Sequence, residues 1–362
     1  MLYTGIKKIT DAEMRQRTIN NLITLRKQLD KEIPEKTANN SLLLATWNIR
    51  AFGKDSRTKE SLYYISEILS RFDLVAIQEV KDQREELEKV VAILGKNWEY
   101  ISTDRTEGSA GNYESIAFLY DTNKVSFKNM AGEIVLPKNQ LIDELQFART
   151  PFCVSFQAGW FKLNLATVHI IYGEDTKKGK EKRRKEIDAL AKFLAKRAKK
   201  EGNNYIVLGD FNIPDVDDSM MRALEDNGFH IPNPIKEHPT DLGETKHYDQ
   251  IAFDLHMNST MQIFDEKVQH AGSFNFTKSV YKLDDYEAYI PIMDPKEIEI
   301  VDESTGKKKT ILERREGEEA RVYYEDSYRT FQMSDHLPLW VELKVDFSGQ
   351  YLENLKKQYA SK

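Results

Sequence analysis

Eight polar side chains share one feature, which is that each stands where a short apolar run of the sequence begins or ends. Polar groups at strand ends can converge at one rim of a sheet, and sites usually form at such rims. Asn48, Glu79, His169, Asp210 and Asn212 close apolar runs, whereas Asp249, Asp335 and His336 precede them.

The chemistry open to this set is hydrolysis of a phosphoester. Glu79, Asp335 and the amide of Asn48 offer hard oxygen ligands and no thiolate. Such ligands suit Mg²⁺, with Mn²⁺ as a possible substitute. Histidines and further carboxylates can neutralise a phosphodiester, activate a water and protonate the leaving group. The residue types therefore predict a metal-assisted hydrolase.

Short apolar runs and amphipathic stretches must position these side chains. Runs of four to nine residues rich in Val, Ile, Leu and aromatics are typical of strands, and amphipathic charged stretches are typical of helices. Because most connections are short, the sheets should be mixed or antiparallel. The predicted strands are Leu42–Ile49, Leu74–Ile77, Ile116–Tyr120, Phe152–Phe156, Leu163–Ile170, Tyr205–Leu208, Gln250–Phe253 and Leu337–Val345, and the predicted helices are 11–30, 57–71, 82–94 and 181–200.

The chain organisation that we expect is one catalytic domain with extensions. Residues 1–40 form a helical extension, 41–346 the domain and 347–362 a helical tail. An irregular elaboration at about 265–330 interrupts the domain, and Glu297–Val301 and Thr310–Leu312 flank a Ser304–Gly306 turn as a hairpin. Trp47, Trp160 and Trp340 lie in or beside the strands and are predicted to be core residues.

Composition narrows the class of protein. The chain has 362 residues, a net charge of −6 and 40% hydrophobic residues, which excludes wholesale disorder. It has no apolar stretch of transmembrane length, so we expect no membrane span. The single cysteine and a charged N-terminal segment without a signal-peptide core favour a cytoplasmic protein. The acidic balance argues against a dedicated nucleic-acid coat, but it permits an enzyme that meets a polyanion through metal ions.

Eight stretches together resemble the endonuclease/exonuclease/phosphatase superfamily, to which pancreatic-type deoxyribonuclease belongs. In family order they read LATWNIR, LVAIQEV, ESIAFLYD, FARTPF, LATVHI, IVLGDFN, HYDQIAFD and MSDHLPLWVEL. The resemblance implies an α+β fold, a four-layer α/β sandwich of two packed mixed β-sheets flanked by helices. It also implies Mg²⁺-dependent phosphoester hydrolysis.

The resemblance further implies a role for each site residue. Glu79 would hold the metal, with Asn48 and Asp335 at or beside it, and Asp210 would orient or deprotonate the attacking water. One departure concerns a tyrosine that the deoxyribonuclease branch places two residues before the glutamate, where this chain has Asn112 and then Tyr113. The remaining implied roles are Asn212 on the pentavalent phosphorus, His336 held by Asp249, His169 backed by Glu114, and Arg149 on a phosphate.

Simpler structural roles compete for each residue taken alone. His169 and Glu114 are then ordinary solvated groups, Asp210 an Asx-turn residue and Arg149 part of a structural ion pair. Independent turn residues have no reason to reproduce an ordered set, so the joint pattern favours a site. The basic run 177–185 begins the last predicted helix, and it is either a solvated face or a surface for an anionic partner.

The predicted function is that of a Mg²⁺-dependent nuclease that cleaves DNA or RNA by in-line attack of an activated water, with nucleic acid as its partner. Two alternatives stay open. One is a phosphodiesterase or phosphatase acting on a lipid head group or a small phosphoester. The other is a non-catalytic interaction scaffold of the same fold.

Overall fold

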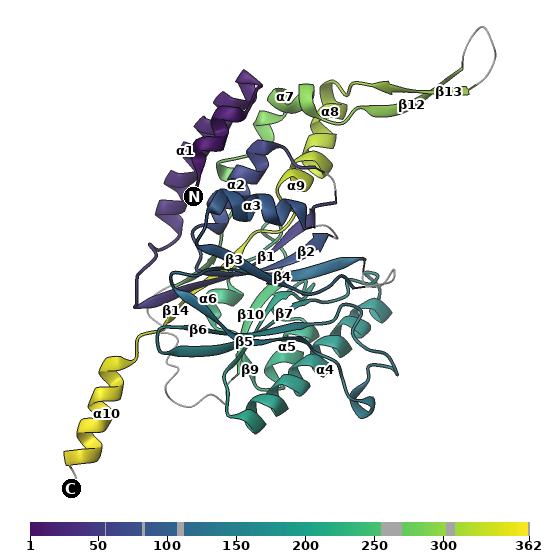
Figure 1. Ribbon diagram of the computed structural model, residues 1–362. Helices are drawn as coiled ribbons and strands as arrows, with labels where there is room; N and C mark the ends of the chain where they lie inside the picture. The colour runs from purple at the N-terminus through teal and green to yellow at the C-terminus, as the bar shows by residue number, and fades with distance from the viewer. Residues whose placement is uncertain (55, 82–83, 107–111, 255–269, 302–307, 361–362) are drawn as a thin grey trace.

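Two six-stranded sheets pack face to face, and helices cover both outer faces (Figure 1). This architecture comes from a computed structural model that describes residues 1–54, 56–81, 84–106, 112–254, 270–301 and 308–360. Both sheets contain parallel and antiparallel pairs. The predicted sandwich of two mixed sheets is therefore confirmed.

The first sheet has the strand order β11-β14-β1-β2-β4-β3. Strands β1 and β2 are parallel, and the other neighbours are antiparallel. The strands are β1 (Ser41–Phe52), β2 (Leu74–Lys81), β3 (Trp98–Ser102), β4 (Glu114–Asp121), β11 (Ala271–Ser273) and β14 (Leu339–Lys344).

The second sheet has the order β5-β6-β7-β8-β10-β9, with β7 and β8 parallel. Each of the eight predicted strands coincides with a strand of one sheet, whereas four strands at or near the edges, β3, β5, β9 and β11, were not predicted. The strands are β5 (Val125–Glu133), β6 (Phe152–Ala158), β7 (Phe161–His169), β8 (Tyr205–Asp210), β9 (Phe229–His230) and β10 (Asp249–Asp254).

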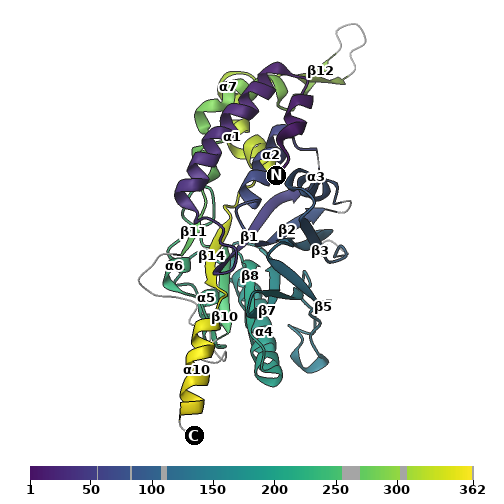
Figure 2. The ribbon, with the colours of Figure 1, turned by 60° about the vertical axis from the view of Figure 1, so that its left-hand side comes forward.

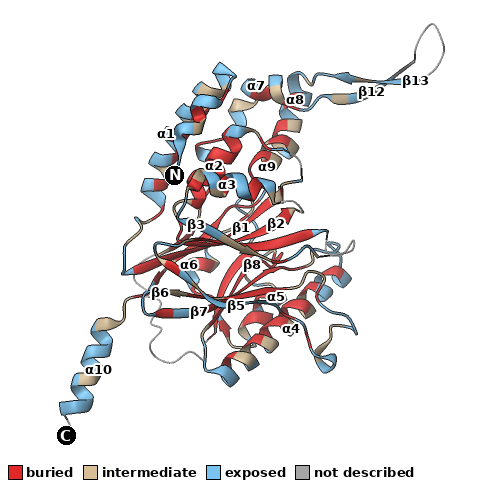
Figure 3. Ribbon diagram, in the orientation of Figure 1, coloured by how far each residue is buried: buried red, intermediate tan, exposed pale blue. Residues whose placement is uncertain are grey.

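Burial on both faces explains the continuous apolar runs of the central strands (Figure 3). Successive side chains of a strand point to opposite faces. In β1, Leu42 and Leu44 pack into the core between the sheets, and Leu43 and Ala45 pack into the core under the outer helices. Position 48 thus shares the inward face of Leu42 and Leu44, at the far end of the strand.

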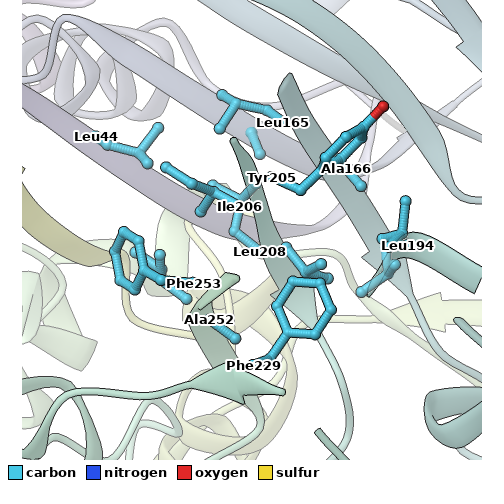
Figure 4. Packing of buried hydrophobic residues seen from close by; sticks show 14 of the residues in the cluster. Leu44, Leu165, Ala166, Leu194, Tyr205, Ile206, Leu208, Phe229, Ala252 and Phe253 are labelled. Carbon is cyan, nitrogen blue, oxygen red and sulfur yellow. The ribbon is translucent and has the colours of Figure 1, made fainter. Parts of the chain in front are cut away.

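The core between the sheets continues through the second sheet to a long helix. Figure 4 shows Leu44 of β1 with Leu165 of β7 and Leu208 of β8, and Leu194 of α4 closes the far side. The long helix is α4 (Lys177–Glu201), and the same layer contains two short helices, α5 (Ser219–Glu225) and α6 (Asn233–Lys236).

Three helices cover the outer face of the first sheet, namely α1 (Ala12–Glu32), α2 (Lys59–Leu69) and α3 (Glu85–Leu94). Asp11 and Thr58 cap α1 and α2 by accepting backbone N–H bonds. These helices and α4 confirm the four predicted helices. The buried stripe of α1 is Thr18, Leu22, Leu25 and Leu29, whereas Ile19 and Ile23 are exposed.

The elaboration packs on the same layer through stacked tyrosines. The ring of Tyr289 lies 4.7 Å from that of Tyr281 and 5.4 Å from that of Tyr324, and Arg17 of α1 lies 4.4 Å over Tyr289. Its elements are α7 (Tyr286–Tyr289), α8 (Gly317–Tyr323), a π-helix (Tyr324–Tyr328) and α9 (Arg329–Gln332). Arg17 also forms an ion pair with the buried Glu60 of α2 at 2.7 Å.

Two elements stand away from this body (Figures 1 and 2). Strands β12 (Lys296–Val301) and β13 (Lys308–Glu313) pair as the predicted hairpin, although its Ser304–Gly306 turn lies outside the described residues. Helix α10 (Ser348–Ala360) is the other element. Among the described residues, no helix is both long and apolar enough to cross a membrane.

The tryptophan predictions hold for two residues of three. Trp47 and Trp340 are buried, but Trp160 is 56% exposed, so its assignment to the core was wrong. Trp160 lies in the turn between β6 and β7, and its ring lies 5.5 Å from that of Tyr351 in α10. A turn position beside a strand does not share the buried face of that strand.

Candidate active site

Two histidine–carboxylate pairs lie at one end of the sandwich. Nδ1 of His169, the last residue of β7, lies 2.8 Å from Oε2 of Glu114, the first residue of β4. Nδ1 of His336, just before β14, lies 2.8 Å from Oδ2 of Asp249, the first residue of β10. Both contacts are buried, and each joins one sheet to the other. The structure thus brings together both predicted pairs.

Asp210 lies between the two imidazoles. Its Oδ2 is 3.5 Å from Nε2 of His169 and 3.8 Å from Nε2 of His336. The same oxygen accepts a hydrogen bond of 2.9 Å from the side-chain amide of Asn48. One carboxylate oxygen therefore meets three polar groups that come from β7, β1 and the segment before β14.

The sequence Gly-Asp-Phe-Asn explains how β8 delivers this carboxylate. Gly209 has a φ of +137°, and a Cβ there would meet the carbonyl oxygen of Val168 at 2.2 Å, so only glycine fits. The carboxylate of Asp210 accepts the backbone N–H of Asn212, whose φ is +54°. The side-chain amide of Asn212 donates to the carbonyl of Ile170, which ties this turn to the residue after His169.

An acidic cluster lies beside Asp210 on the first sheet. Oε1 of Glu79 accepts from the amide of Asn48 at 3.1 Å, and Oε2 accepts from the backbone N–H of Ala51. Glu79 has a φ of +61° where the ladder between β1 and β2 shifts register, which turns it out of the strand pattern. Glu79 and the exposed Asp335 line one cavity of about 670 Å³.

The donor chemistry of this cluster fits a hard cation. Oδ1 of Asn48 is buried, and it has no hydrogen-bond partner within the described part of the chain. A buried amide oxygen without a donor is a suitable ligand for Mg²⁺ beside a carboxylate. Glu79, Glu114 and His169 also place ligand atoms within 4.8 Å of one another and could together hold a metal ion.

Glu114 is engaged by cationic groups. Its carboxylate lies 3.1 Å from Nζ of Lys81, 3.1 Å from Nε of Arg149 and beside the amide of Asn112. Burial raises its pKa, but His169, Arg149 and Lys81 outweigh burial and lower the pKa to about 2. With its charge so compensated, Glu114 is better placed to orient His169 than to bind a cation.

Both site histidines are poised to be cationic. Burial lowers the pKa of His169, but Glu114 and Asp210 outweigh burial and raise the pKa overall. Burial likewise opposes the charging of His336, yet Asp249 and Asp210 raise its pKa well above the ordinary value. Burial raises the pKa of Asp249 to about 6 against the pull of His336. The surroundings therefore favour the imidazolium form of both histidines on either side of Asp210.

Arg149 and Tyr113 are the two residues that the sequence suggested as phosphate contacts. Arg149 lies against Glu114, and its Nη1 is buried with no hydrogen-bond partner among the described residues. Tyr113 is 48% exposed and lines the same cavity as Glu79, with a φ of +53°. The one-residue shift of the tyrosine therefore still leaves it at the mouth of the site.

Several residues that support the site were not predicted from the sequence. Ser334 accepts the N–H of His336 and donates to the carbonyl of Asn48, and Thr240 accepts the N–H of Asp249. The ring of Tyr248 lies 5.5 Å from that of His336. Ser334 and Tyr248 lie inside the quoted stretches, so adjacency to His336 and Asp249 was an available signal. Thr240 carried no such signal.

The basic run 177–185 forms the first turns of α4, which Thr176 caps. Part of it is paired, since Lys180 contacts Asp175, Arg184 contacts Glu181 and Lys185 contacts Asp143. Arg183 is buried and donates to the backbone carbonyl of Asn212. The exposed lysines Lys177, Lys178 and Lys182 have no ion pair within the ranges that the structure describes.

Comparison with known proteins gives one sequence family. A family model described as the Endonuclease/Exonuclease/phosphatase family matches residues 45–260, which is more than half of the chain. Deoxyribonuclease-1 of Bos taurus is 28% identical over 196 aligned residues, which cover 48% of this chain. The match spans 61% of the bovine protein's own length.

Solved structures share the fold at low sequence identity. A mannosyl-6-phosphatase from Bacteroides thetaiotaomicron is 15% identical with a TM-score of 0.50, and the match covers 84% of this chain and 99% of that one. A conserved protein of unknown function from Enterococcus faecalis is 16% identical with a TM-score of 0.50, over 83% of this chain and 98% of that one.

Proposed function

Because this chain belongs to the endonuclease/exonuclease/phosphatase family, whose members hydrolyse phosphoester bonds, we propose that it is a Mg²⁺-dependent nuclease that cleaves DNA or RNA. The observation that carries the proposal is the Asp210 carboxylate, one oxygen of which lies 3.5 and 3.8 Å from two imidazole nitrogens. A carboxylate between two charged imidazoles can accept a proton from water while the imidazoles face an anionic substrate.

The proposal gives each site residue a defined role. Asp210 accepts the proton of the attacking water, and the amide of Asn48 fixes the orientation of its carboxylate. Glu114 and Asp249 hold the two imidazoles in place through their Nδ1 atoms, which leaves both Nε2 atoms directed at the reaction centre. One imidazolium stabilises the charge on the phosphoryl oxygens, and the other protonates the leaving alkoxide.

Glu79, Asn48 and Asp335 would hold the cation. When bound there, Mg²⁺ supplies positive charge to the phosphoryl oxygens and the leaving oxygen. The buried Oδ1 of Asn48 and the shared cavity of Glu79 and Asp335 support this donor set. Asn212 and Arg149 remain the proposed contacts of the phosphorus-bound oxygens.

The basic side chains of the cavity suit a polymeric substrate. Arg50, Lys54, Lys81 and Lys89 line it together with four acidic residues, Glu79, Glu85, Glu86 and Asp335. Cations spread along an open cavity can contact successive phosphates of a nucleic-acid backbone. The similarity to bovine deoxyribonuclease-1 supports the same choice.

Nicking of supercoiled plasmid tests the proposal. We expect open circles from the wild type with Mg²⁺, none after chelation with EDTA, and a loss of at least about a hundredfold in Asp210→Asn. Asp226→Asn, at an exposed aspartate that ends α5, is the matched control and should keep wild-type activity.

Two outcomes would contradict the proposal in different ways. Equal nicking by wild type and Asp210→Asn would remove Asp210 from the chemistry. Intact plasmid and intact single-stranded DNA and RNA with the wild type would exclude a nuclease, and the small phosphoesters and lipid head groups of the alternative would become the substrates to test.

A further inference from the structure

We infer that Tyr172 is a stacking platform for the nucleobase next to the cleaved phosphodiester, and that the enzyme therefore prefers unpaired strands. The inference deepens the proposed nuclease function and rests on it. Tyr172 lies three residues after His169, in the loop that joins β7 to α4, and 45% of its side chain is exposed.

A buried arginine supports one side of the ring. Cζ of Arg183 lies 4.7 Å from the centre of the Tyr172 ring, and Nη1 of Arg183 donates to the backbone carbonyl of Asn212. Arg183 is only 2% exposed, so its guanidinium cannot swing away from the ring. This contact links Tyr172 through Arg183 and Asn212 to the Asp210 turn, and Tyr172 stays 45% exposed.

The loop that carries Tyr172 is tightly packed. Gly173 has a φ of +62°, and a Cβ added to it would lie 3.6 Å from Cα of Gly179 in α4. A Cβ on Gly179 would meet the carbonyl oxygen of Glu174 at 2.0 Å. The loop backbone thus packs against the first turn of the helix and Arg183 supports the ring, and this order before binding reduces the entropy lost when a ligand binds.

Tyr172 lies on the same rim as the reacting groups. Tyr172 follows His169 by three residues, and Arg183 joins its ring to Asn212, whose backbone N–H donates to the Asp210 carboxylate. A nucleotide whose phosphate lies at Asp210 can therefore reach Tyr172 with its base.

The charge next to Tyr172 suits a nucleic-acid strand. Lys177, Lys178 and Lys182 are exposed in the first turns of α4, five to ten residues after the tyrosine, beyond the exposed Glu174 and Asp175, of which Asp175 pairs with Lys180. An aromatic ring beside backbone-directed cations is the combination by which proteins bind single strands. Stacking needs an exposed base face, which a paired and stacked duplex does not offer.

Removal of the base tests the inference by a double-mutant cycle. The substrates are two single-stranded oligonucleotides with one cleavable linkage, one complete and one with a tetrahydrofuran abasic residue beside that linkage. For the wild type, we expect loss of the base on one side of the linkage to lower kcat/KM by about fivefold to a hundredfold, mainly through KM.

Substitutions of Tyr172 test whether this fall in kcat/KM arises from stacking on its ring. In Tyr172→Ala, kcat/KM should fall by the same factor on the complete oligonucleotide and almost not at all on the abasic one. Tyr172→Phe should behave like the wild type on both substrates. Trp160→Ala, which removes an exposed aromatic side chain of the β6–β7 turn, is the matched control and should change neither substrate. The preference for a single strand over the same sequence as a duplex should shrink only in Tyr172→Ala.

Each failure has its own meaning. If the wild type cleaves both oligonucleotides and Tyr172→Ala loses equally on both, the ring does not contact the base and this inference is wrong alone. The inference is also wrong if Tyr113→Ala, and not Tyr172→Ala, lowers kcat/KM only on the oligonucleotide that carries the base. If the wild type cleaves neither oligonucleotide, the proposed nuclease function falls and this inference falls with it.

Discussion

The Asp210 carboxylate depends on residues that no local pattern connects to it. Its partners Asn48 and His336 are separated by most of the chain, yet the backbone carbonyl of Asn48 accepts from Ser334, which in turn accepts from His336. The positions of the two residues are therefore coupled to each other. Any substitution that moves one of them should move the oxygen that they share.

Glu114→Gln tests how one residue tunes another. Removal of this carboxylate leaves burial and Arg149, which lower the pKa of His169, against Asp210, which raises it. Because the wild-type pKa is raised, the variant should lose the imidazolium at a lower pH. We expect activity to fall by about tenfold or more and the alkaline limb of the kcat/KM profile to move to lower pH.

Glu133→Gln on the exposed part of β5 is the control for that profile. A limb that stays in place in Glu114→Gln, with activity retained, would show that Glu114 does not set the protonation of His169. Thermal unfolding of both variants separates this effect from a loss of folded protein.

Cys153 gives a prediction about reactivity. Burial raises the pKa of its thiol to about 12, and the side chain is 1% exposed. Because the thiolate is the reactive form, the native protein should resist iodoacetamide at pH 8 and should be alkylated once unfolded in urea. Rapid stoichiometric labelling of the native protein, measured by mass, would contradict the buried position.

Most of the site residues could be predicted from the sequence, but the charged side chains around them could not. Glu114 and His169 lie in recognisable stretches, and their pairing followed from the family resemblance. The contact of Lys81 with Glu114 was not predicted because it depends on strand register. The two residues lie directly opposite each other in the ladder of β2 and β4. Register of this kind is set by tertiary packing and leaves no mark on the residues themselves.

Among the elements, central strands were predictable and edge strands were not. The strands β1, β2 and β8 are mostly apolar and almost wholly buried because both faces are covered. β5 is mostly exposed along its length and alternates poorly, so its sequence resembles a loop. The edge strand β9 is two residues long and carries no pattern at all.

The close contact of β7 and β8 yields a prediction at this scale. Gly209→Ala would place a methyl group 2.2 Å from the Val168 carbonyl at a φ of +137°. We expect a loss of about 2 kcal/mol or more in the free energy of unfolding, together with loss of activity. Gly132→Ala in β5, where an added Cβ meets nothing within 4 Å, is the control in urea unfolding. Equal stability of the two variants would contradict the tight approach.

At the scale of the whole molecule, α1 and the elaboration form one layer with α2. Arg17 of α1 pairs with Glu60 of α2 and lies over Tyr289 of the elaboration, more than 200 positions away in the sequence. The sequence predicted α1 and a separate elaboration, but not their contact. Tyr281 and Tyr289 lie in one segment of the chain and Tyr324 and Tyr328 in another, and the sequence does not show that the two segments meet, which is why the stacking was not predicted.

Arg17→Met tests this layer. Removal of the guanidinium leaves the fully buried Glu60 without its counter-ion, so we expect a loss of about 3 kcal/mol in the free energy of unfolding at pH 7. Burial already raises the pKa of Glu60, and the loss of Arg17 should raise it further. The deficit should therefore shrink as the pH falls and Glu60 becomes protonated.

Lys27→Met, at an exposed position of α1, is the control. Urea unfolding at pH 7 and pH 5 measures both variants. A deficit in Arg17→Met that is the same at the two pH values would show that the buried charge is not its cause.

The histidine pairs have a consequence for how activity is lost. Glu114 and His336 come from the first sheet, whereas His169 and Asp249 come from the second. Neither sheet therefore contains a complete histidine–carboxylate pair, and the geometry of the site depends on how the two sheets pack on each other. A slip of one sheet along the other by a single ångström would part both imidazoles from their carboxylates. Hydrolysis should then stop while the helices and strands are still intact.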